Sequence, residues 1–404
     1  MPDIDVDFAK CIKDDVIDYV KQKYGYNAIC KISVSNRYSS KGAINLSSEY
    51  LGKKYNDQAY LFIGITMISY LRNEDTDKRF CLTDYMDDLL SIAHIDKRKA
   101  ADILKIASCL EKTVSHKSVH PSGVIIADTD VVDCVPVKME QDGDLIAECD
   151  KDEAEGFYHL LKMDFLTLTA LDLISYTMRS ISVKEHICVS FEQIPYEKEV
   201  FESIINQGYT DFIFQLSKPD MKQVLRSIKP QSIDDLMLVL SVNRPGPKQY
   251  IDTICKIKSG EEQPQYPVPE LEPILKETYG CIVFQEQVMR IFTDLAGYSS
   301  GEADMIRSAI AKKKKAVIVA EHDKFLDGCV KNGLDKEKAN SLYNQIVDFG
   351  EYCFNKSHAA AYSLIAYRMA WLYYHYPQHF LCFAPFFSDS KTTIFYEESP
   401  VSKF

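Results

Sequence analysis

The first regular alternation of polar and apolar positions lies in MPDIDVDF, residues 1–8. Asp3, Asp5 and Asp7 alternate there with apolar residues. Side chains of a β-strand point alternately to its two faces. The pattern therefore predicts a strand with three carboxylates on one face and apolar side chains on the other. Three like charges on one face repel one another unless a cation lies among them.

The next patterns predict a β-rich unit with an interruption. Apolar positions at helical spacing predict a helix that ends at Gly25, and residues 28–35 predict a second strand. Residues 36–119 are mainly helical and charged, whereas residues 120–139 are β-rich again. Residues 157–181 predict a short strand that runs into a helix. From about residue 200 onward the pattern is mostly helical, so distant strand segments are predicted to share one sheet.

A second carboxylate segment is LLKMDFL, where Lys162 and Asp164 share one face of a predicted strand. If this strand pairs with the first, Asp164 joins Asp3 and Asp5. Carboxylate oxygens are the ligands that Mg²⁺ prefers, and three of them can hold two ions roughly 3.5–4 Å apart. Lys162 would then meet a phosphate. A solvated, aggregation-resistant edge strand explains the alternation equally well, so periodicity alone leaves both interpretations open.

The C-terminal part carries basic and aromatic residues. SGEADMIRSAIAKKKKAV predicts a helix that carries Arg307 and the run Lys312–Lys315, either as a solvated face or as phosphate contacts. FGEYCFNKSH combines a tyrosine with basic residues, which suits base stacking and phosphate contact. The aromatic residues that follow are predicted to be helix core; they are Tyr367, Trp371 and Tyr374. His375 and His379 are separated by Pro377 and are not expected to form a zinc site.

Composition narrows the class of protein. The chain is 46% hydrophobic and 26% charged, which is typical of a globular protein. The net charge of -12 argues against a generally basic nucleic-acid coat but allows a local basic groove. The 12 cysteines form no CxxC pair and are predicted to be reduced thiols. With neither a signal peptide nor a long apolar run, the sequence predicts a cytoplasmic protein.

Several longer segments, in the same order, resemble bacterial family C DNA polymerases of the DNA polymerase III alpha subunit type. They are MPDIDVDF, HPSGVIIA, LLKMDFL, FIFQLSKPDMKQVLRSIKP, NRPGP, LEPILKETYGCIVFQEQVM, LAGYSSGEADMIR and YCFNKSHAAAYSLIAY. The resemblance implies an α+β fold in which a polymerase beta-like nucleotidyltransferase palm (1–35 and 120–170) is interrupted by a helical thumb (36–119). Mostly helical fingers (171–404), truncated at their C-terminal end, would follow.

The resemblance also implies site residues. Asp3, Asp5 and Asp164 would be the catalytic ligands of two Mg²⁺ ions, with Asp7 in a supporting role. Lys162 and Arg307 would hold the triphosphate. The remaining residues expected to bind dNTP or DNA are Tyr352, which packs against the incoming nucleotide, Arg244, Asn355, Lys356 and His358.

The implied function is that of a template-directed DNA polymerase core, which adds dNMP to a primer 3′-hydroxyl and releases pyrophosphate. Its partners would be primer-template DNA, dNTPs, other replisome subunits and a separate chain that supplies a PHP domain and a GRGSxAGS palm loop. Asp164→Asn is expected to abolish primer extension with the fold intact. The alternative is an inactive polymerase-derived protein that binds primer-template or a replisome partner; a metal-dependent phosphohydrolase explains fewer of the motifs.

Departures from the family pattern at five positions bear on nucleotide binding. Ser308 replaces the second arginine of the fingers pair, and Ala311 replaces a glycine before the lysine run. Thr167 and Thr169 replace the Gly and Arg of FLGLRTL, and Ser115 replaces an arginine before the HAGG-like segment. One charge-assisted hydrogen bond contributes roughly 1.5–3 kcal/mol, so the loss of one arginine predicts about tenfold weaker binding.

Overall fold

A computed structural model describes residues 4–73, 81–140, 143–244 and 246–387, which form two compact units. The first unit takes in the strand that begins at Ile4 and residues 12–167. The second takes in residues 9–11 and the chain from Leu168 onward. A mixed α/β first unit and a helical second unit agree with the predicted α+β class.

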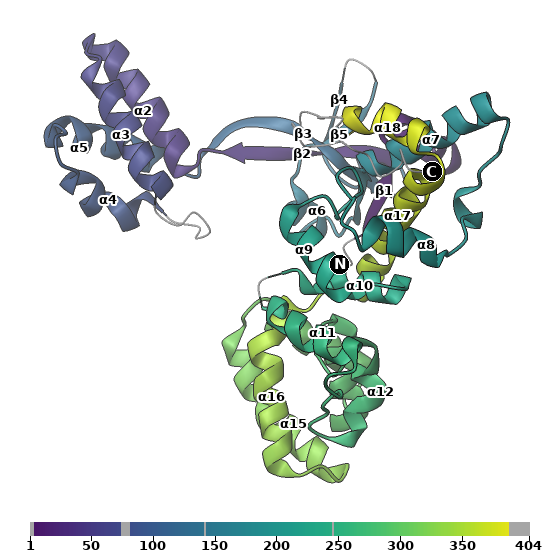
Figure 1. Ribbon diagram of the computed structural model, residues 1–404. Helices are drawn as coiled ribbons and strands as arrows, with labels where there is room; N and C mark the ends of the chain where they lie inside the picture. Colours follow the sequence, from purple (N-terminus) through teal and green to yellow (C-terminus); the bar gives the residue numbers. More distant parts are fainter. Residues whose placement is uncertain (1–3, 74–80, 141–142, 245, 388–404) are drawn as a thin grey trace. The chain divides into compact units, whose positions relative to one another are not determined.

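One six-stranded sheet organises the first unit (Figure 1). Its spatial order is β1-β6-β3-β2-β5-β4. The pairs β1·β6 and β2·β5 are parallel, and the other neighbours are antiparallel. The strands are β1 Ile4–Phe8, β2 Ile29–Arg37, β3 Val114–Ile126, β4 Val137–Met139, β5 Leu145–Ala147 and β6 Lys162–Thr167. The short helix α6, Lys151–Gly156, precedes β6.

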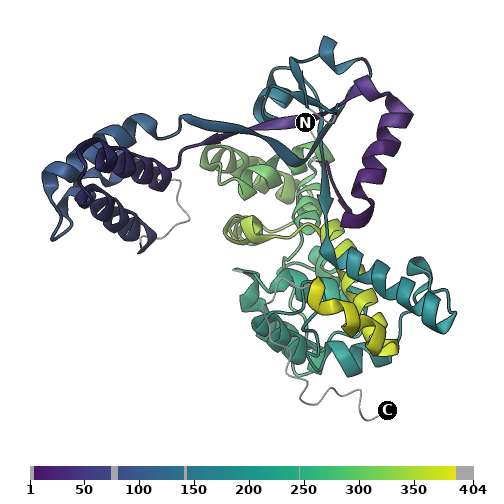
Figure 2. The ribbon, with the colours of Figure 1, turned by 90° about the horizontal axis from the view of Figure 1, so that it is seen from above.

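Four helices follow β2 and precede β3, so the long β2·β3 ribbon leads to them (Figure 2). They are α2 Ser40–Tyr55, α3 Ala59–Asn73, α4 Leu82–Ser91 and α5 Lys97–Leu110. They pack around a hydrophobic core of their own. Gly64 allows α2 and α3 to approach closely, since a Cβ there would lie 2.6 Å from the Cβ of Ser48. The predicted helices are present within residues 40–110, whereas the ends of the range, residues 36–37 and 114–119, belong to β2 and β3.

Helix α1, Lys13–Tyr24, covers the apolar face of β1 and β6. It ends where predicted, at Gly25, whose φ of +105° suits a residue without a side chain. Phe8 and Phe165 meet across the strand pair with ring centroids 5.3 Å apart. Val16, Ile17 and Val20 of the helix belong to the same cluster. The predicted division of this strand into an apolar and an acidic face is therefore present.

The second unit is helical and has two hydrophobic cores. Its first core contains Tyr367 and Trp371, which are buried as predicted, with Tyr374 packed against it. The helices are α7 Thr169–Glu185, α8 Lys198–Val200, α9 Pro219–Ile228, α10 Ile233–Val242, α11 Ile251–Ser259, α12 Glu272–Leu275, α13 Gln285–Arg290, α14 Ser300–Ala311, α15 Lys315–Lys331, α16 Lys336–Phe349, α17 Lys356–His375 and α18 Pro377–Phe383.

Residues 9–11 are tied to this unit by a buried carboxylate on α7. Asp172 is 3% exposed, and its two oxygens accept the backbone N–H groups of Lys10 (3.0 Å) and Cys11 (3.1 Å). Two backbone donors satisfy a carboxylate that would otherwise be costly to bury. The chain that leaves β1 is thereby held beside the start of α7, which follows β6 directly.

None of the described helices combines the length and the apolar character that crossing a bilayer requires.

Candidate active site

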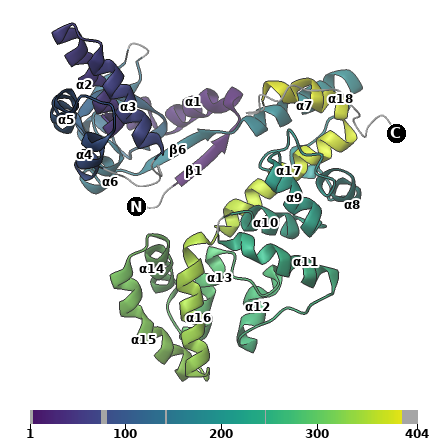
Figure 3. The same cartoon turned by 60° about the vertical axis from the view of Figure 1, so that its left-hand side comes forward.

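Strand β1 lies beside β6, and their acidic positions share one face (Figure 3 shows the two strands). The parallel register pairs Asp5 with Asp164 and Asp7 with Leu166. Because paired residues point to the same side of a sheet, both carboxylates of the first pair share a face. The predicted pairing of the two strands is thus present. Asp3, the third predicted ligand, lies outside the described residues.

The Asp164 carboxylate is held from two strands. Lys162, on the same strand, donates a hydrogen bond to Oδ2, and the hydroxyl of Ser122 on β3 donates to Oδ1 at 3.1 Å. Burial alone would raise the pKa of Asp164, but the hydrogen bond and charge of Lys162, with the hydroxyl of Ser122, hold it below its usual value. Asp164 is therefore an anion near neutral pH.

Lys162 is buried, with a side chain that is 3% exposed. Its aliphatic stem passes over Gly123 of β3, where a Cβ would lie 2.8 Å from the lysine Cε. Any other residue at this position would therefore push the lysine aside. The sequence predicted a lysine that meets a phosphate; the structure places its ammonium group on Asp164.

His120 closes a turn within β3. Its Nδ1 accepts the backbone N–H groups of Gly123 at 2.8 Å and of Ser122 at 3.2 Å. Burial, together with the charge of Lys162, lowers the pKa of His120, so the ring is neutral near pH 7. Sequence reasoning did not select His120 or Ser122 as site residues. The segment HPSG, quoted only as a motif, contains both.

The arrangement suits a hard cation. Asp5 and Asp164 offer carboxylate oxygens on adjacent strands, which are donors that Mg²⁺ accepts. Within the described ranges, no group of three or more His, Cys, Asp and Glu side chains is arranged to hold a metal ion. Two of the three predicted carboxylates are therefore placed, and the donor set fits Mg²⁺ in kind.

The second unit gathers five of the basic and aromatic residues around the chain before α17. We call Arg244, Arg307, Tyr352, Phe354 and Lys356 the basic-aromatic cluster. The guanidinium of Arg244 lies 3.9 Å from the ring centroid of Phe354. Gly246, with φ +88°, lies under Tyr352; a Cβ there would be 2.7 Å from the tyrosine Cγ. The NRPGP and YCFNKSH segments therefore pack directly together.

Gln285, the first residue of α13, joins Arg307 to this cluster. Its Oε1 accepts from Arg307 Nη1 at 3.0 Å, and its Nε2 donates to the carbonyl of Cys353 at 3.2 Å. Its backbone N–H donates to the carbonyl of Phe354 at 2.9 Å. Arg307 Nε also donates to Asp304 at 2.8 Å. Sequence reasoning quoted QEQVM but did not assign a role to its glutamine.

The other predicted residues of the YCFNKSH segment have structural partners. Asn355 is the N-cap of α17 and accepts the backbone N–H of His358 at 2.8 Å. Lys356 Nζ donates to Glu277 at 2.5 Å. The His358 ring packs against Phe354, with centroids 5.2 Å apart. Each of these contacts gives the side chain a local structural role.

The prediction that Arg307 and Lys312–Lys315 lie on one helix is wrong. Helix α14 ends at Ala311 and α15 begins at Lys315. Lys313 adopts φ +52°, so the chain turns between the two helices. Residues 311–317 are all exposed, and this run has no buried apolar position to hold a helical turn against a core. Lys312–Lys314 therefore form an exposed, basic connection between α14 and α15.

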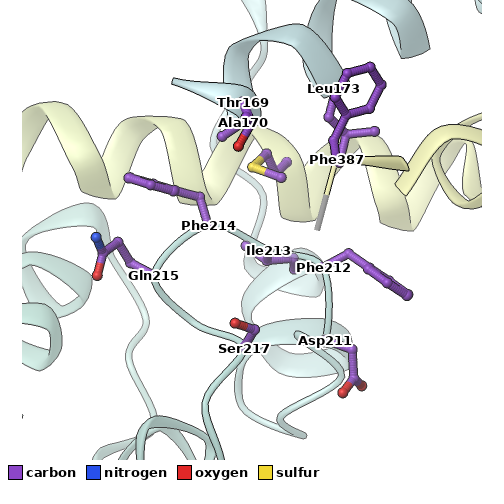
Figure 4. A pocket seen from close by; sticks show the side chains of 11 residues that line it. Thr169, Ala170, Leu173, Asp211, Phe212, Ile213, Phe214, Gln215, Ser217 and Phe387 are labelled. Atoms are coloured by element: carbon purple, nitrogen blue, oxygen red, sulfur yellow. The ribbon is translucent and has the colours of Figure 1, made fainter. Parts of the chain in front are cut away.

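A cavity of about 120 Å³ lies where the start of α7 faces the loop before α9 (Figure 4). Thr169, Ala170, Phe212, Phe214 and Gln215 are among its lining residues. This volume accommodates about four waters, whereas pockets for larger ligands span roughly 300–1,000 Å³. The cavity is therefore too small for a nucleotide, and no residue predicted to bind nucleotide lines it.

Comparisons with known proteins match these two regions separately. The bacterial DNA polymerase III alpha NTPase domain matches residues 1–167, and the bacterial DNA polymerase III alpha subunit finger domain matches residues 170–333. DNA polymerase III subunit alpha of Aquifex aeolicus is 35% identical over 398 residues, covering 94% of this chain and 34% of that protein.

Relatives from two other bacteria match the chain with similar identity and coverage. The Bacillus subtilis protein of the same name is 36% identical over 389 residues, covering 95% of this chain and 34% of the relative. The Pseudomonas aeruginosa protein is 35% identical over 393 residues, covering 94% of this chain and 33% of the relative. The chain thus spans about a third of the length of these curated relatives.

Proposed function

Because the chain belongs to the family of bacterial DNA polymerase III alpha subunits, we propose that it is the palm, thumb and part of the fingers of a template-directed DNA polymerase. The sheet of the first unit is the palm in this proposal, helices α2–α5 are the thumb, and the second unit belongs to the fingers. The observation that carries the proposal is the register that sets Asp5 opposite Asp164, with Lys162 on the same face.

In the proposed reaction, the primer 3′-oxygen forms a bond to the α-phosphorus of a dNTP. The bond from that phosphorus to the bridging oxygen of pyrophosphate breaks, and the hydroxyl proton is lost to solvent. Asp5 and Asp164, with Asp3, would hold two Mg²⁺ ions, which supply charge for the attacking and leaving oxygens. Through these ions the carboxylates would orient the reacting groups.

The basic side chains contribute charge at the phosphates. Lys162 lies on the carboxylate face and is proposed to contact the triphosphate. Arg307 is held at two of its nitrogens by Gln285 and Asp304 and keeps further donors for phosphate oxygens. Tyr352 is 38% exposed beside Gly246, which leaves part of its ring for packing against the incoming nucleotide.

A second candidate is a protein that binds primer-template without catalysis. Two observations favour it. Ser308 stands where the family pattern has a second arginine, and Lys356 is already paired with Glu277. Both reduce the positive charge available to a triphosphate, whereas neither prevents contact with a DNA backbone through exposed lysines.

The test is Mg²⁺-dependent extension of a labelled primer-template by the chain alone and with a protein that carries a PHP domain and a GRGSxAGS loop. We expect extension in at least the second condition. Asp5→Asn changes a proposed Mg²⁺ ligand and should reduce extension to background. Because Asp5 is exposed, the substitution leaves the core intact. Asp15→Asn, on the exposed side of α1, is the matched control and should leave extension unchanged.

Normal extension by Asp5→Asn would refute the catalytic assignment. Duplex binding measured by fluorescence anisotropy separates the two candidates. Tight binding without extension in either condition would support the second candidate instead.

A further inference from the structure

The turn formed by His120, Ser122 and Gly123 presents a hydroxyl to the palm carboxylates. His120 Nδ1 accepts both backbone N–H groups of the turn, at 2.8 and 3.2 Å. With Nδ1 as the acceptor, the ring proton resides on Nε2. The imidazole therefore acts as a clamp on the backbone of β3 and fixes the position of Ser122.

The fixed hydroxyl reaches across to β6. Ser122 Oγ lies 3.1 Å from Asp164 Oδ1, and the β-register sets Gly123 directly opposite Asp164. Ser122 is 8% exposed, so bulk water competes little for this hydrogen bond. Lys162 meets the other oxygen, Oδ2. The carboxylate consequently has one donor at each oxygen, which restricts rotation of its plane.

In metal sites, hydrogen bonds to ligating side chains set the orientation of the ligand. Their removal commonly costs about 10–100-fold in metal affinity or activity.

We propose that Ser122 is a positioning residue for Asp164 and that its hydroxyl sets the carboxylate for divalent-cation binding beside Asp5. The inference rests on the proposed function, since it takes Asp164 as a cation ligand. Without the hydroxyl the carboxylate must be ordered during binding, so cation affinity falls by about tenfold.

The experiment measures Mn²⁺ binding to the full chain by electron paramagnetic resonance, with no primer and no nucleotide. Ser122→Ala should raise the Kd about tenfold. Ser122→Thr keeps a hydroxyl and should stay within about threefold of the wild type. Ser118→Ala is the matched control, because Ser118 lies on the same strand and its hydroxyl accepts from Asn36. It should leave the Kd unchanged.

Asp164→Asn tests the role of Asp164 as a cation ligand separately from the positioning role of Ser122. If Asp164→Asn loses Mn²⁺ binding while Ser122→Ala binds as the wild type does, the positioning role is refuted and the proposed function stands. If Asp164→Asn also binds Mn²⁺ normally, the assignment of Asp164 as a ligand is wrong. Should Ser122→Ala fail to fold by circular dichroism, Ser122→Gly provides the same comparison. Unchanged affinity in that variant equally refutes the role.

Discussion

Replacing Asp164 with asparagine should weaken the palm sheet as well as any chemistry. The side chain of Lys162 is 3% exposed and its stem lies over Gly123, so without Asp164 its charge would be left without this partner in a largely buried position. Two unit charges about 4 Å apart attract by about 4 kcal/mol at an effective dielectric constant near 20. Breaking a buried pair by removing one partner costs roughly 3–5 kcal/mol.

The lower end of that range applies here. Asp164 is 14% exposed, and Asp5 lies on the neighbouring strand, where it can share the lysine charge. We therefore expect Asp164→Asn to lower the free energy of opening of this region by about 3 kcal/mol. The sequence alone predicted an intact fold for this variant, because nothing in the pattern KMDF indicates a buried lysine.

Hydrogen exchange measured by mass spectrometry is the suitable assay. The chain has one tryptophan, which lies on α17, so its fluorescence reports on the second unit. Amides of β3 and β6 report on the first unit. A loss of about 3 kcal/mol corresponds to exchange roughly 150-fold faster. Amides of α17 provide the internal control and should not change.

A double-mutant cycle isolates the pair. Lys162→Met removes the charge and keeps the length, and the double variant Lys162→Met/Asp164→Asn leaves neither charge buried. The double variant should be more stable than the sum of the two single changes by about 2 kcal/mol. A coupling energy below about 0.5 kcal/mol would refute the reasoning, since distant sites commonly show that much.

The pH dependence has a definite sign. The pKa of Asp164 lies below its usual value of 3.8. The native state therefore binds this proton less readily than the unfolded state. The contribution of the pair is complete above about pH 4–5 and is lost as the pH falls through the lower native pKa. Exchange of β6 amides in Asp164→Asn should lack this component.

Two further substitutions test the basic-aromatic cluster. Gly246→Ala combines a positive φ with a clash on the Tyr352 ring, and should lower the stability of the second unit by about 2 kcal/mol in urea denaturation followed by tryptophan fluorescence. Gly260→Ala is the control, because Gly260 has a similar φ of +82° and no atom lies within 4 Å of a Cβ built there. Equal urea midpoints for the two variants would show that the clash with Tyr352 does not destabilise the protein. Gln285→Leu should weaken dNTP binding by roughly tenfold, because Arg307 loses a charge-assisted hydrogen bond. Unchanged affinity by equilibrium titration with a chain-terminated primer would contradict this role of Gln285.

Periodicity was sufficient for the elements that bury one face and leave the other polar. The alternation around Asp5 and the pair Lys162/Asp164 predicted two strands with matching faces, and both strands form. The helix ending at Gly25 was predictable because its apolar spacing and its terminator are local. Burial of apolar side chains imposes such patterns directly on the sequence.

The contacts that complete the site depend on distant positions. Ser122 meets Asp164 only because β3 enters the sheet between β6 and β2 with a particular register. No local pattern encodes that register. Asp172 likewise reads as one polar residue of an apolar helix, although it holds backbone groups of Lys10 and Cys11. Asn355 was expected to bind dNTP or DNA, although asparagine directly before a helix is also a common N-cap, which is the role it has in the structure.

The order of β1 and β6 along the chain matters during synthesis. Ile4 pairs with Met163, so a ribosome adding 5–20 residues per second needs roughly 8–30 s to supply the partner of the first strand. Helices α2–α5 and their core are complete well before then. The acidic strand is thus synthesised well before its partner β6 and is joined to it only after the intervening helices are complete. The region proposed to perform chemistry is assembled only after the structure inserted within it has folded.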